Sequence, residues 1–278
     1  MNISKLQDQI GRTIFYFVLL IFVLISVVPI IWIWSSAFKP KMEIFLNPFG
    51  IPEKFILDNL LHAWSIGRMN VYFWNSIYVS IPTVLIVLSV ASLAGYGFAK
   101  LSLWGKDILF FILLLGLIVP FQGIIVSLYQ TIFSLNLIDN RWAVILSESA
   151  WQVPFSTFLM RSFFRSLPDE FMDAARIDGC SEFQIFRTIM LPLAKPAILS
   201  LVMISFMWIW NDFLLSLLFL HKESLRTLPL GLMFFRGRYS SDYALIAAGV
   251  TICSAPIIIV YVFLQRYFEA GIASGGIK

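Results

Sequence analysis

Polar side chains within long apolar stretches are the first candidates for chemistry in this sequence. Glu148 and Gln152 lie four residues apart, so a helix would place them on one face. Asn211 and Asp212 follow Trp208 near the end of another apolar stretch. Carboxylate and amide groups hydrogen-bond to hydroxyl groups, and an aromatic ring offers a flat apolar surface. This combination suits the binding of a small polar solute.

A purely structural role for the same residues is the alternative. Polar side chains between membrane helices often only join the helices, and tryptophan near the end of a span is usually an interfacial anchor. Polar groups are costly in lipid, so they usually face a bundle interior or a wet cavity. We take Glu148, Gln152 and Asn211 as candidates for a solute path.

The composition places these residues in a membrane protein. Of 278 residues, 59% are hydrophobic and only 13% are charged, whereas about 25% are charged in an ordinary soluble domain. This excludes a soluble enzyme of normal composition and a disordered tail protein. The net charge of +4 fits flanks that lie against anionic lipid better than a nucleic-acid-binding patch.

Six apolar runs are long enough to cross a bilayer, which takes about 20 residues of helix. They cover residues 13–38, 71–99, 108–130, 142–160, 196–220 and 243–264. The first is about twice as long as the apolar part of a signal peptide, so we expect an uncleaved span. The sequence therefore predicts an all-α membrane protein with six transmembrane helices in a single domain, residues 1–278.

The distribution of basic residues gives a weak indication of orientation. The face that would hold both termini and the loops 100–107 and 161–195 carries 11 of the 20 lysines and arginines. The positive-inside rule therefore favours cytoplasmic termini by a small margin.

The connection 161–195 is too long for a simple turn and has the signals of two short helices. Pro168 suits the first position of a helix, and Gly179 suits its left-handed end. The segment Ser181–Gln184 has the spacing of a capping box that begins a second helix. The dipeptide Leu191–Pro192 is expected to close that helix.

The charges of this loop favour a protein partner over a lipid surface. Interfacial helices are usually rich in lysine and arginine, whereas acidic residues here match or outnumber basic ones. Ala174 and Ala175 are small enough to let another backbone approach closely. The loop is therefore expected to dock a cytoplasmic protein.

The same loop resembles the EAA loop of ABC-importer permeases. The resemblance is carried by Leu167, Pro168, Asp169, Glu170, Phe171, Asp173, Ala174, Ala175, Arg176, Ile177, Asp178, Gly179, Leu191, Pro192 and Pro196. Asp173 stands where the family usually has glutamate, which keeps the charge. The resemblance implies that residues 166–191 form a two-helix coupling loop, which docks on a separate ATPase subunit. The implied contact residues are Asp173, Ala174, Ala175, Arg176, Asp178, Gly179, Leu191 and Pro192.

Further segments are similar to carbohydrate-type permeases, and in particular to the maltose-type second permease subunit. These are Asn75–Ser76, 91–100, 210–213, 227–232 and the tail from Gln265 through Gly271 and Gly275 to Lys278. The resemblance implies a pore-forming subunit for a sugar or oligosaccharide in a prokaryotic cytoplasmic membrane, with cytoplasmic termini. Its implied partners are a second permease subunit, two ATPase subunits and an extracellular solute-binding protein. The two glycines are expected in a flexible cytoplasmic tail.

The sequence holds no ATP-binding loop of its own. The only Gly-Lys pair, Gly105–Lys106, is followed by Asp107 and lacks the glycine required upstream. ATP and magnesium are therefore expected in the partner ATPase, with no cofactor, metal site or catalytic residue in this chain. The alternative is a stand-alone secondary transporter or channel, in which Glu148 and Asp212 would be the ion-coupling candidates. A membrane enzyme has no nucleophile–base pair to support it.

Overall fold

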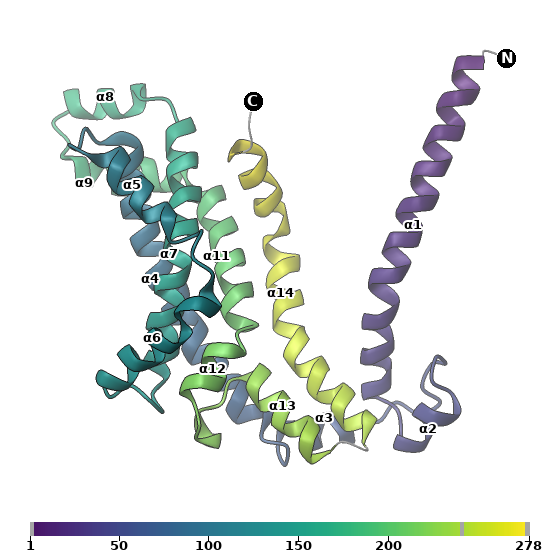
Figure 1. Cartoon of the computed structure of the whole chain (residues 1–278). Helices are drawn as coiled ribbons and strands as arrows, with labels where there is room; N and C mark the ends of the chain where they lie inside the picture. Colours follow the sequence, from purple (N-terminus) through teal and green to yellow (C-terminus); the bar gives the residue numbers. More distant parts are fainter. Residues whose placement is uncertain (1–2, 240–241, 276–278) are drawn as a thin grey trace. The chain divides into compact units, whose positions relative to one another are not determined.

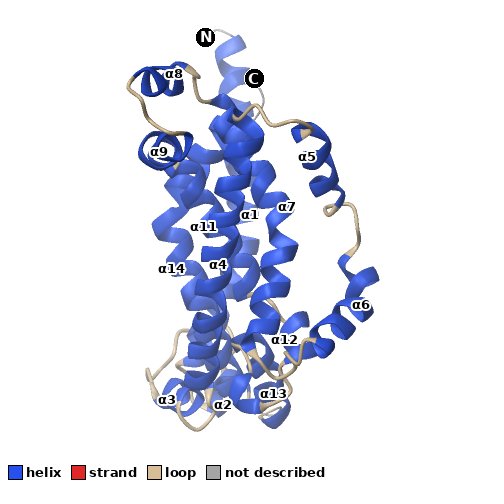
Figure 2. Ribbon diagram, turned by 90° about the vertical axis from the view of Figure 1, so that its left-hand side faces the viewer, coloured by secondary structure: helices blue, strands red, loops and turns tan. Residues whose placement is uncertain are grey.

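All regular elements of the described residues are helices (Figures 1 and 2). The computed structural model describes the backbone of residues 3–239 and 242–275 and the side chains of residues 9–239 and 242–266. Lys278 and the Lys5 side chain, which contributed to the charge count, lie outside these ranges. The chain divides into two compact units, and each is described by itself.

The first unit comprises residues 1–69 and 232–254. It contains α1 (Ile3–Ala37), α2 (Lys41–Leu46), α3 (Asp58–Trp64) and parts of α13 (Leu228–Arg238) and α14 (Tyr243–Gly275). Its connection after α1 is ordered around the buried Lys39, whose Nζ donates hydrogen bonds to the carbonyl oxygens of Asn47 (2.8 Å) and Pro48 (3.3 Å). These hydrogen bonds to backbone carbonyl oxygens offset the free-energy cost of burying the lysine.

The second unit comprises residues 70–231 and 255–278 and holds both candidate sites. Its helices are α4 (Met69–Lys100), α5 (Lys106–Leu115), α6 (Phe121–Ser134), α7 (Arg141–Ser166), α8 (Glu170–Ile177), α9 (Glu182–Ile185), the π-helix η1 (Phe186–Met190), α10 (Leu191–Leu193), α11 (Lys195–Trp210), α12 (Leu214–Phe219) and the 3₁₀ helix η2 (Glu223–Leu225). The start of α13 and the end of α14 complete it.

Three described helical stretches are long and apolar enough to cross a membrane by themselves: Gln9–Ala37, Met69–Lys100 and Tyr243–Arg266. They correspond to the first, second and sixth predicted runs. A fourth would result if the pair Glu182–Leu193 and Lys195–Trp210, bent by 76°, were one span. The helix of the fourth run, α7, is longer than predicted, and its buried face carries polar residues.

Two predicted spans are interrupted. Run 108–130 is divided into α5 and α6 by residues 116–120, because Gly116 is a poor helix former and Pro120 has no N–H to donate. Run 196–220 ends at Trp210 and resumes in α12, where the Asp212 carboxylate accepts the N–H of Leu215 at 3.1 Å. The expectation of one continuous helix in each run was therefore wrong.

The expected flexible tail is also corrected. Helix α14 continues through Gly275, so Gly271 and Gly275 lie in a helical backbone. Residues 257–270 contain neither proline nor glycine, and nothing in the sequence stops the helix before that point.

A glycine allows α4 and α7 to approach closely. A Cβ atom at Gly95 would lie 2.7 Å from the Cβ of Met160 and 2.9 Å from the backbone nitrogen of Arg161. Only a residue without a side chain fits at this position. The crossing brings the end of α4 beside the end of α7, next to the loop that follows α7.

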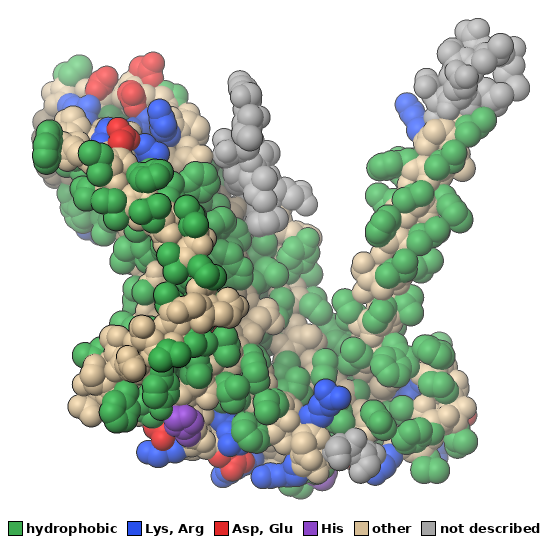
Figure 3. All heavy atoms as spheres, in the orientation of Figure 1, with side chains coloured by type: hydrophobic (Ala, Val, Ile, Leu, Met, Phe, Trp, Pro, Cys, Tyr) green, Lys and Arg blue, Asp and Glu red, His purple; other side chains and the backbone are tan. Residues whose placement is uncertain are grey.

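The surface of this unit changes character along its length. Charged side chains gather over α8 and α9, while the adjoining flank is hydrophobic (Figure 3). On α5, for example, Ile108, Phe111 and Ile112 are more than half exposed. Apolar exposure on this scale is typical of surfaces covered by lipid or by a partner.

Candidate functional sites: a two-helix loop and a cavity between helices

The first helix of loop 166–191 is shorter than predicted. Helix α8 begins at Glu170, and the carbonyl oxygen of Asp169 accepts the first N–H bonds, from Met172 (2.9 Å) and Asp173 (3.1 Å). Pro168 therefore precedes the helix instead of occupying its first position. Its fixed φ is still compatible with the extended entry to the helix.

The glycine turn between the two helices is confirmed. Gly179 has φ +81°, a left-handed conformation that side chains adopt only with strain. Its N–H donates to the carbonyl oxygen of Arg176, and the N–H of Cys180 donates to that of Ala175, each at 3.0 Å. An added Cβ would meet no atom within 4 Å. The requirement for glycine therefore comes from backbone conformation alone.

The capping box at the second helix is also confirmed. The Ser181 N–H donates to Gln184 Oε1 at 2.7 Å, and the Gln184 N–H donates to Ser181 Oγ at 3.4 Å. The helix does not close at Leu191–Pro192, however. It continues through the π-helix η1 into α10, which ends at Leu193, because Pro192 lies in the first turn of α10, where no N–H is needed.

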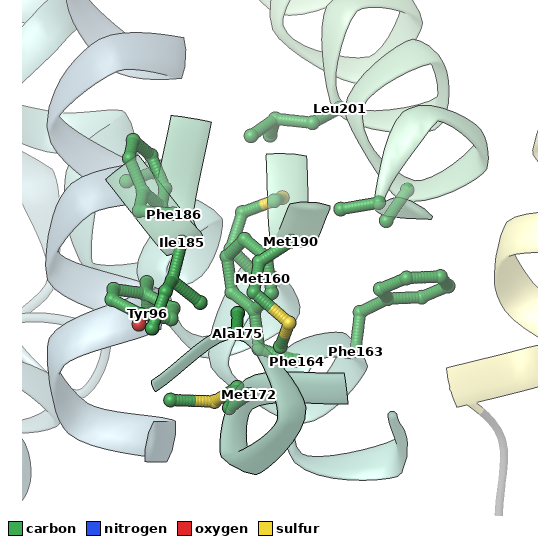
Figure 4. Packing of buried hydrophobic residues seen from close by; sticks show 13 residues of the cluster. Tyr96, Met160, Phe163, Phe164, Met172, Ala175, Ile185, Phe186, Met190 and Leu201 are labelled. Carbon is green, nitrogen blue, oxygen red and sulfur yellow. The ribbon is translucent and has the colours of Figure 1, made fainter. Parts of the chain in front are cut away.

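A dense apolar core holds the loop against α4 and α7 (Figure 4). Its loop members are Met172, Ala175, Ile185, Phe186 and Met190, and its members from α4 and α7 include Tyr96, Met160, Phe163 and Phe164. Ala175 is only 5% exposed and packs inward. The expectation that both alanines admit a partner was therefore wrong for Ala175, whereas Ala174 is exposed.

An ion-pair network crosses the loop above this core. Arg176 Nε donates to Glu182 Oε1 at 2.8 Å, and its Nη1 donates to Asp173 Oδ1 at 3.0 Å. The Tyr96 hydroxyl of α4 donates to Glu182 Oε2 at 3.1 Å. The Arg176 guanidinium lowers the pKa of the Glu182 carboxyl, and Glu182 in turn raises the pKa of Arg176. The two helices are thus joined through one carboxylate.

A second contact joins α4 to the start of the loop. Lys100 Nζ donates to the carbonyl oxygen of Leu167 at 2.6 Å and also bonds to the Asp169 carboxylate. The Lys100 side chain is buried, whereas that of Asp169 is exposed. The hydrogen bond and charge of Lys100 lower the pKa of the Asp169 carboxyl.

The residues predicted to contact the ATPase differ in their exposure to solvent. Exposed on the loop are Asp173, Ala174, Arg176, Asp178, Gly179 and Pro192, while Leu191 is half-buried. The first five lie on α8 or in the turn that follows it. This part of the loop therefore presents a charged, exposed surface on a rigid apolar base.

The second candidate site is a cavity of about 560 Å³ between α7, α11 and α14. It is lined by Glu148, Trp151, Met203, Ile204, Met207, Trp208, Asn211 and Tyr261. The structure thus brings Glu148 and Asn211 together with the tryptophan predicted to lie near them. Trp151 and Tyr261 were not predicted, since nothing local in the sequence marks them as neighbours of this site.

Gln152 has a supporting position instead of lining the cavity. It is fully buried, and its Nε2 donates to Glu148 Oε2 at 2.8 Å. Ser205 of α11 donates its Oγ hydrogen to Gln152 Oε1 at 2.5 Å. These two hydrogen bonds give a partner to both the nitrogen and the oxygen of the Gln152 amide. The series Ser205–Gln152–Glu148 therefore fixes the Glu148 carboxylate at the cavity wall.

Asp212 has a structural role. Its carboxylate accepts the N–H of Leu215 and both the N–H (2.9 Å) and the hydroxyl (2.8 Å) of Ser216 at the start of α12. Asn211 is exposed, and its Nδ2 donates to the carbonyl oxygen of Met207 at 2.8 Å. Of this polar pair, Asn211 lines the cavity and Asp212 caps a helix.

Sequence reasoning missed the loop contacts of α4. Tyr96 and Lys100 are spaced four residues apart, which does place them on one helix face. Their partners, however, lie about 70 to 90 residues further along the chain.

Among the described residues, no group of three or more His, Cys, Asp or Glu side chains is arranged to hold a metal ion.

Residues 88–274 match the family described as binding-protein-dependent transport system inner membrane component. The chain belongs to this family. It is 36% identical to the probable ABC transporter permease protein YurM of Bacillus subtilis, over 97% of this chain and 89% of that protein. It is 35% identical to the arabinooligosaccharides transport system permease protein AraQ of Halalkalibacterium halodurans, over 91% of this chain and 92% of that protein. It is 31% identical to the multiple sugar-binding transport system permease protein MsmG of Streptococcus mutans, over 99% of this chain and 100% of that protein.

The fold is shared with a solved importer. A chain from a bacterial ABC transporter involved in the import of the acidic polysaccharide alginate matches with a TM-score of 0.83, 23% identity and coverage of 94% of this chain and 98% of that chain. At this identity the likeness shows the fold. The family match and the similar proteins make this permease a pore-forming, inner-membrane transport component of an ABC importer.

Proposed function

We propose that this permease carries a sugar or oligosaccharide inward across the cytoplasmic membrane, driven by a separate ATPase that docks on loop 166–191. The observation that carries the proposal is the loop itself. Its charged residues are exposed on α8, while Met172, Ala175, Ile185, Phe186 and Met190 are buried against α4 and α7. Relatives whose names include arabinooligosaccharides and multiple sugars support the solute class.

The proposal assigns six membrane crossings and cytoplasmic termini. The 26 residues of α7 span about 39 Å at 1.5 Å per residue, which exceeds a hydrocarbon core of roughly 30 Å. The interrupted pairs α5–α6 and α11–α12 each form one further crossing. Non-helical backbone at these interruptions is tolerated if it lies in protein or lines a wet cavity. With an even number of crossings, loop 166–191 and both termini share the cytoplasmic face.

ATP and magnesium belong to the partner ATPase in this proposal. Two ATPase subunits, a second permease and an extracellular solute-binding protein complete the importer. Closing of the ATPase dimer would displace the surface formed by Asp173, Ala174 and Arg176. Because the loop has a close-packed base, it would move as a unit and pass the displacement to the helices beneath it.

The cavity lined by Glu148 and Asn211 is the proposed part of the solute path in this subunit. Its volume of about 560 Å³ lies within the range of roughly 300–1,000 Å³ found for small-molecule sites. Glu148 offers a carboxylate acceptor held by Gln152, and Trp208 is 43% exposed as an apolar surface. These groups match the hydroxyls and the apolar ring faces of a sugar.

Gentle detergent extraction of the tagged chain from its host, followed by mass spectrometry, tests the proposal. A stoichiometric ATPase and a second permease should accompany the chain. Gly179→Val should lose the ATPase, because valine strains the left-handed turn. Gly105→Val is a matched control: Gly105 has φ +71° and open space around it, but it lies outside the loop.

The result that contradicts the proposal is equally clear. If the chain is recovered alone or only as a homo-oligomer under several mild conditions, the docking interpretation fails. If both glycine variants lose the ATPase equally, the loss reflects general damage instead of a docking surface on loop 166–191.

A further inference from the structure

Two side chains at the end of α4 hold loop 166–191 on both sides of α8. The Tyr96 hydroxyl reaches Glu182, which follows α8, at 3.1 Å. One helical turn later, Lys100 Nζ reaches the carbonyl oxygen of Leu167 and the carboxylate of Asp169, which precede α8. We call these two α4 residues the Tyr96–Lys100 pair. In the described part of the chain, no other helix makes side-chain hydrogen bonds to both ends of this loop.

The tyrosine of the pair is fixed in place. Tyr96 is only 4% exposed, and its ring packs edge-on against Phe164 (5.8 Å between ring centroids) and at a tilt against Phe186 (5.2 Å). The hydroxyl is thus directed at Glu182 with little rotational freedom. Because Glu182 also accepts from Arg176, which pairs with Asp173, the tyrosine is connected to the exposed surface of α8.

The lysine of the pair is similarly constrained. Only 5% of the Lys100 side chain is exposed. A charged donor in a desolvated position makes stronger hydrogen bonds than a surface lysine, and losing its acceptors is costly. Lys100 therefore holds the chain where it leaves α7 and enters α8.

These polar bonds add direction to what the apolar core already connects. The core packs the loop against both α4 and α7, and the ring of Tyr96 is part of it. The polar bonds join the loop to α4 in defined directions. We propose that Tyr96 and Lys100 are positioning residues for energy coupling, which make α8 and the end of α4 move as one body when the ATPase closes. This inference rests on the proposed docking of an ATPase on loop 166–191.

Distance measurement between two spin labels tests the inference in the complete importer. Phe171→Cys on α8, which is not one of the proposed ATPase contacts, and Leu93→Cys on α4 are both exposed sites for the labels (48% and 50%), in a Cys180→Ser/Cys253→Ser background. The probe is MgATP with orthovanadate, compared with the nucleotide-free complex. With the pair intact, the distance should stay the same, within about 1 Å, in the two states.

The variant Tyr96→Phe/Lys100→Met should uncouple the two labels. Helix shifts in such transitions are on the order of 1–2 Å or larger, so the distance should differ by about 2 Å or more between the states, or its distribution should broaden. Tyr78→Phe/Lys106→Met is the matched control. Tyr78 faces the Arg141 guanidinium, and Lys106 Nζ donates to the carbonyl oxygen of Leu101, so these contacts lie outside loop 166–191. The control should behave like the unmodified complex.

The outcomes separate the inference from the function on which it rests. If no ATPase accompanies the chain, the proposed function fails. If the ATPase is present and the label distance in the unmodified complex changes between the states, the inference about the Tyr96–Lys100 pair is wrong while the function stands. If the double variant keeps a constant distance, the pair is not needed for joint movement, which also overturns the inference.

Discussion

Loop 166–191 and the cavity beside Glu148 are built in opposite ways. In the loop, short helices pack closely, and the charges of Asp169, Asp173, Arg176 and Glu182 pair with one another or with Lys100 of α4. At the cavity, three helices leave a volume of about 560 Å³, and one carboxylate is held from behind by Gln152. Close packing suits the transmission of movement, whereas an open volume with few polar groups suits the passage of a solute.

The largest expected effect concerns the core of the loop. Phe186→Ala should lower the free energy of unfolding by about 3–5 kcal/mol, because Phe186 is 7% exposed and packs on Tyr96 and Phe164. Phe183→Ala in the same loop should cost less than about 1 kcal/mol, since Phe183 is 64% exposed. Thermal unfolding and limited proteolysis of the loop would measure both. Equal destabilisation would contradict the description of a one-sided core.

The next prediction separates the two acidic residues near the cavity. Glu148→Gln should reduce uptake about tenfold or more, because a bond to a charged acceptor contributes about 1.5–3 kcal/mol. Asp212→Asn should instead lower stability by about 1 kcal/mol through a weaker helix cap, with uptake per folded molecule unchanged. Transport assays normalised to folded protein, with thermal unfolding in parallel, measure both. The reverse pattern would place the solute path at Asp212.

A smaller effect concerns pH at the loop. Lys100 lowers the pKa of Asp169 in the folded protein, below the value of about 3.9 for an unfolded aspartate. The stability from this pair is therefore fully present above about pH 4 and is lost as the pH falls through the lowered pKa. Protease sensitivity of the loop, measured from pH 6 to pH 3, should rise at the acid end. Asp169→Asn should raise the sensitivity at pH 6 and flatten this part of the profile; an unchanged profile would contradict the assignment.

The features of the loop that were predicted correctly from the sequence depend only on residues close to one another along the chain. The Gly179 turn and the Ser181–Gln184 capping box are satisfied by atoms within a few positions of each other. The inward packing of Ala175 was missed because it depends on α7 and on η1. The two contacts of Tyr96 and Lys100 were missed for the same reason, since their partners are far along the chain.

The membrane helices show a different limit of sequence reasoning. An apolar run predicts that a segment is surrounded by lipid or protein, but it does not show that the helix is continuous. Pro120 and Asp212 divide two such runs. The cavity residues Glu148 and Asn211 could be proposed from their cost in lipid, whereas Tyr261 could be placed there only by packing of α14 against α7 and α11.

The central claim is that the exposed surface of α8 contacts an ATPase, and site-specific photo-crosslinking tests it most directly. A photoreactive residue at Ala174 should crosslink to the ATPase subunit in intact membranes. The same residue at Trp104, which is 99% exposed in the loop between α4 and α5, should not do so with comparable yield. Crosslinks at position 174 to lipid alone, or to the ATPase from position 104 but not 174, would contradict the account.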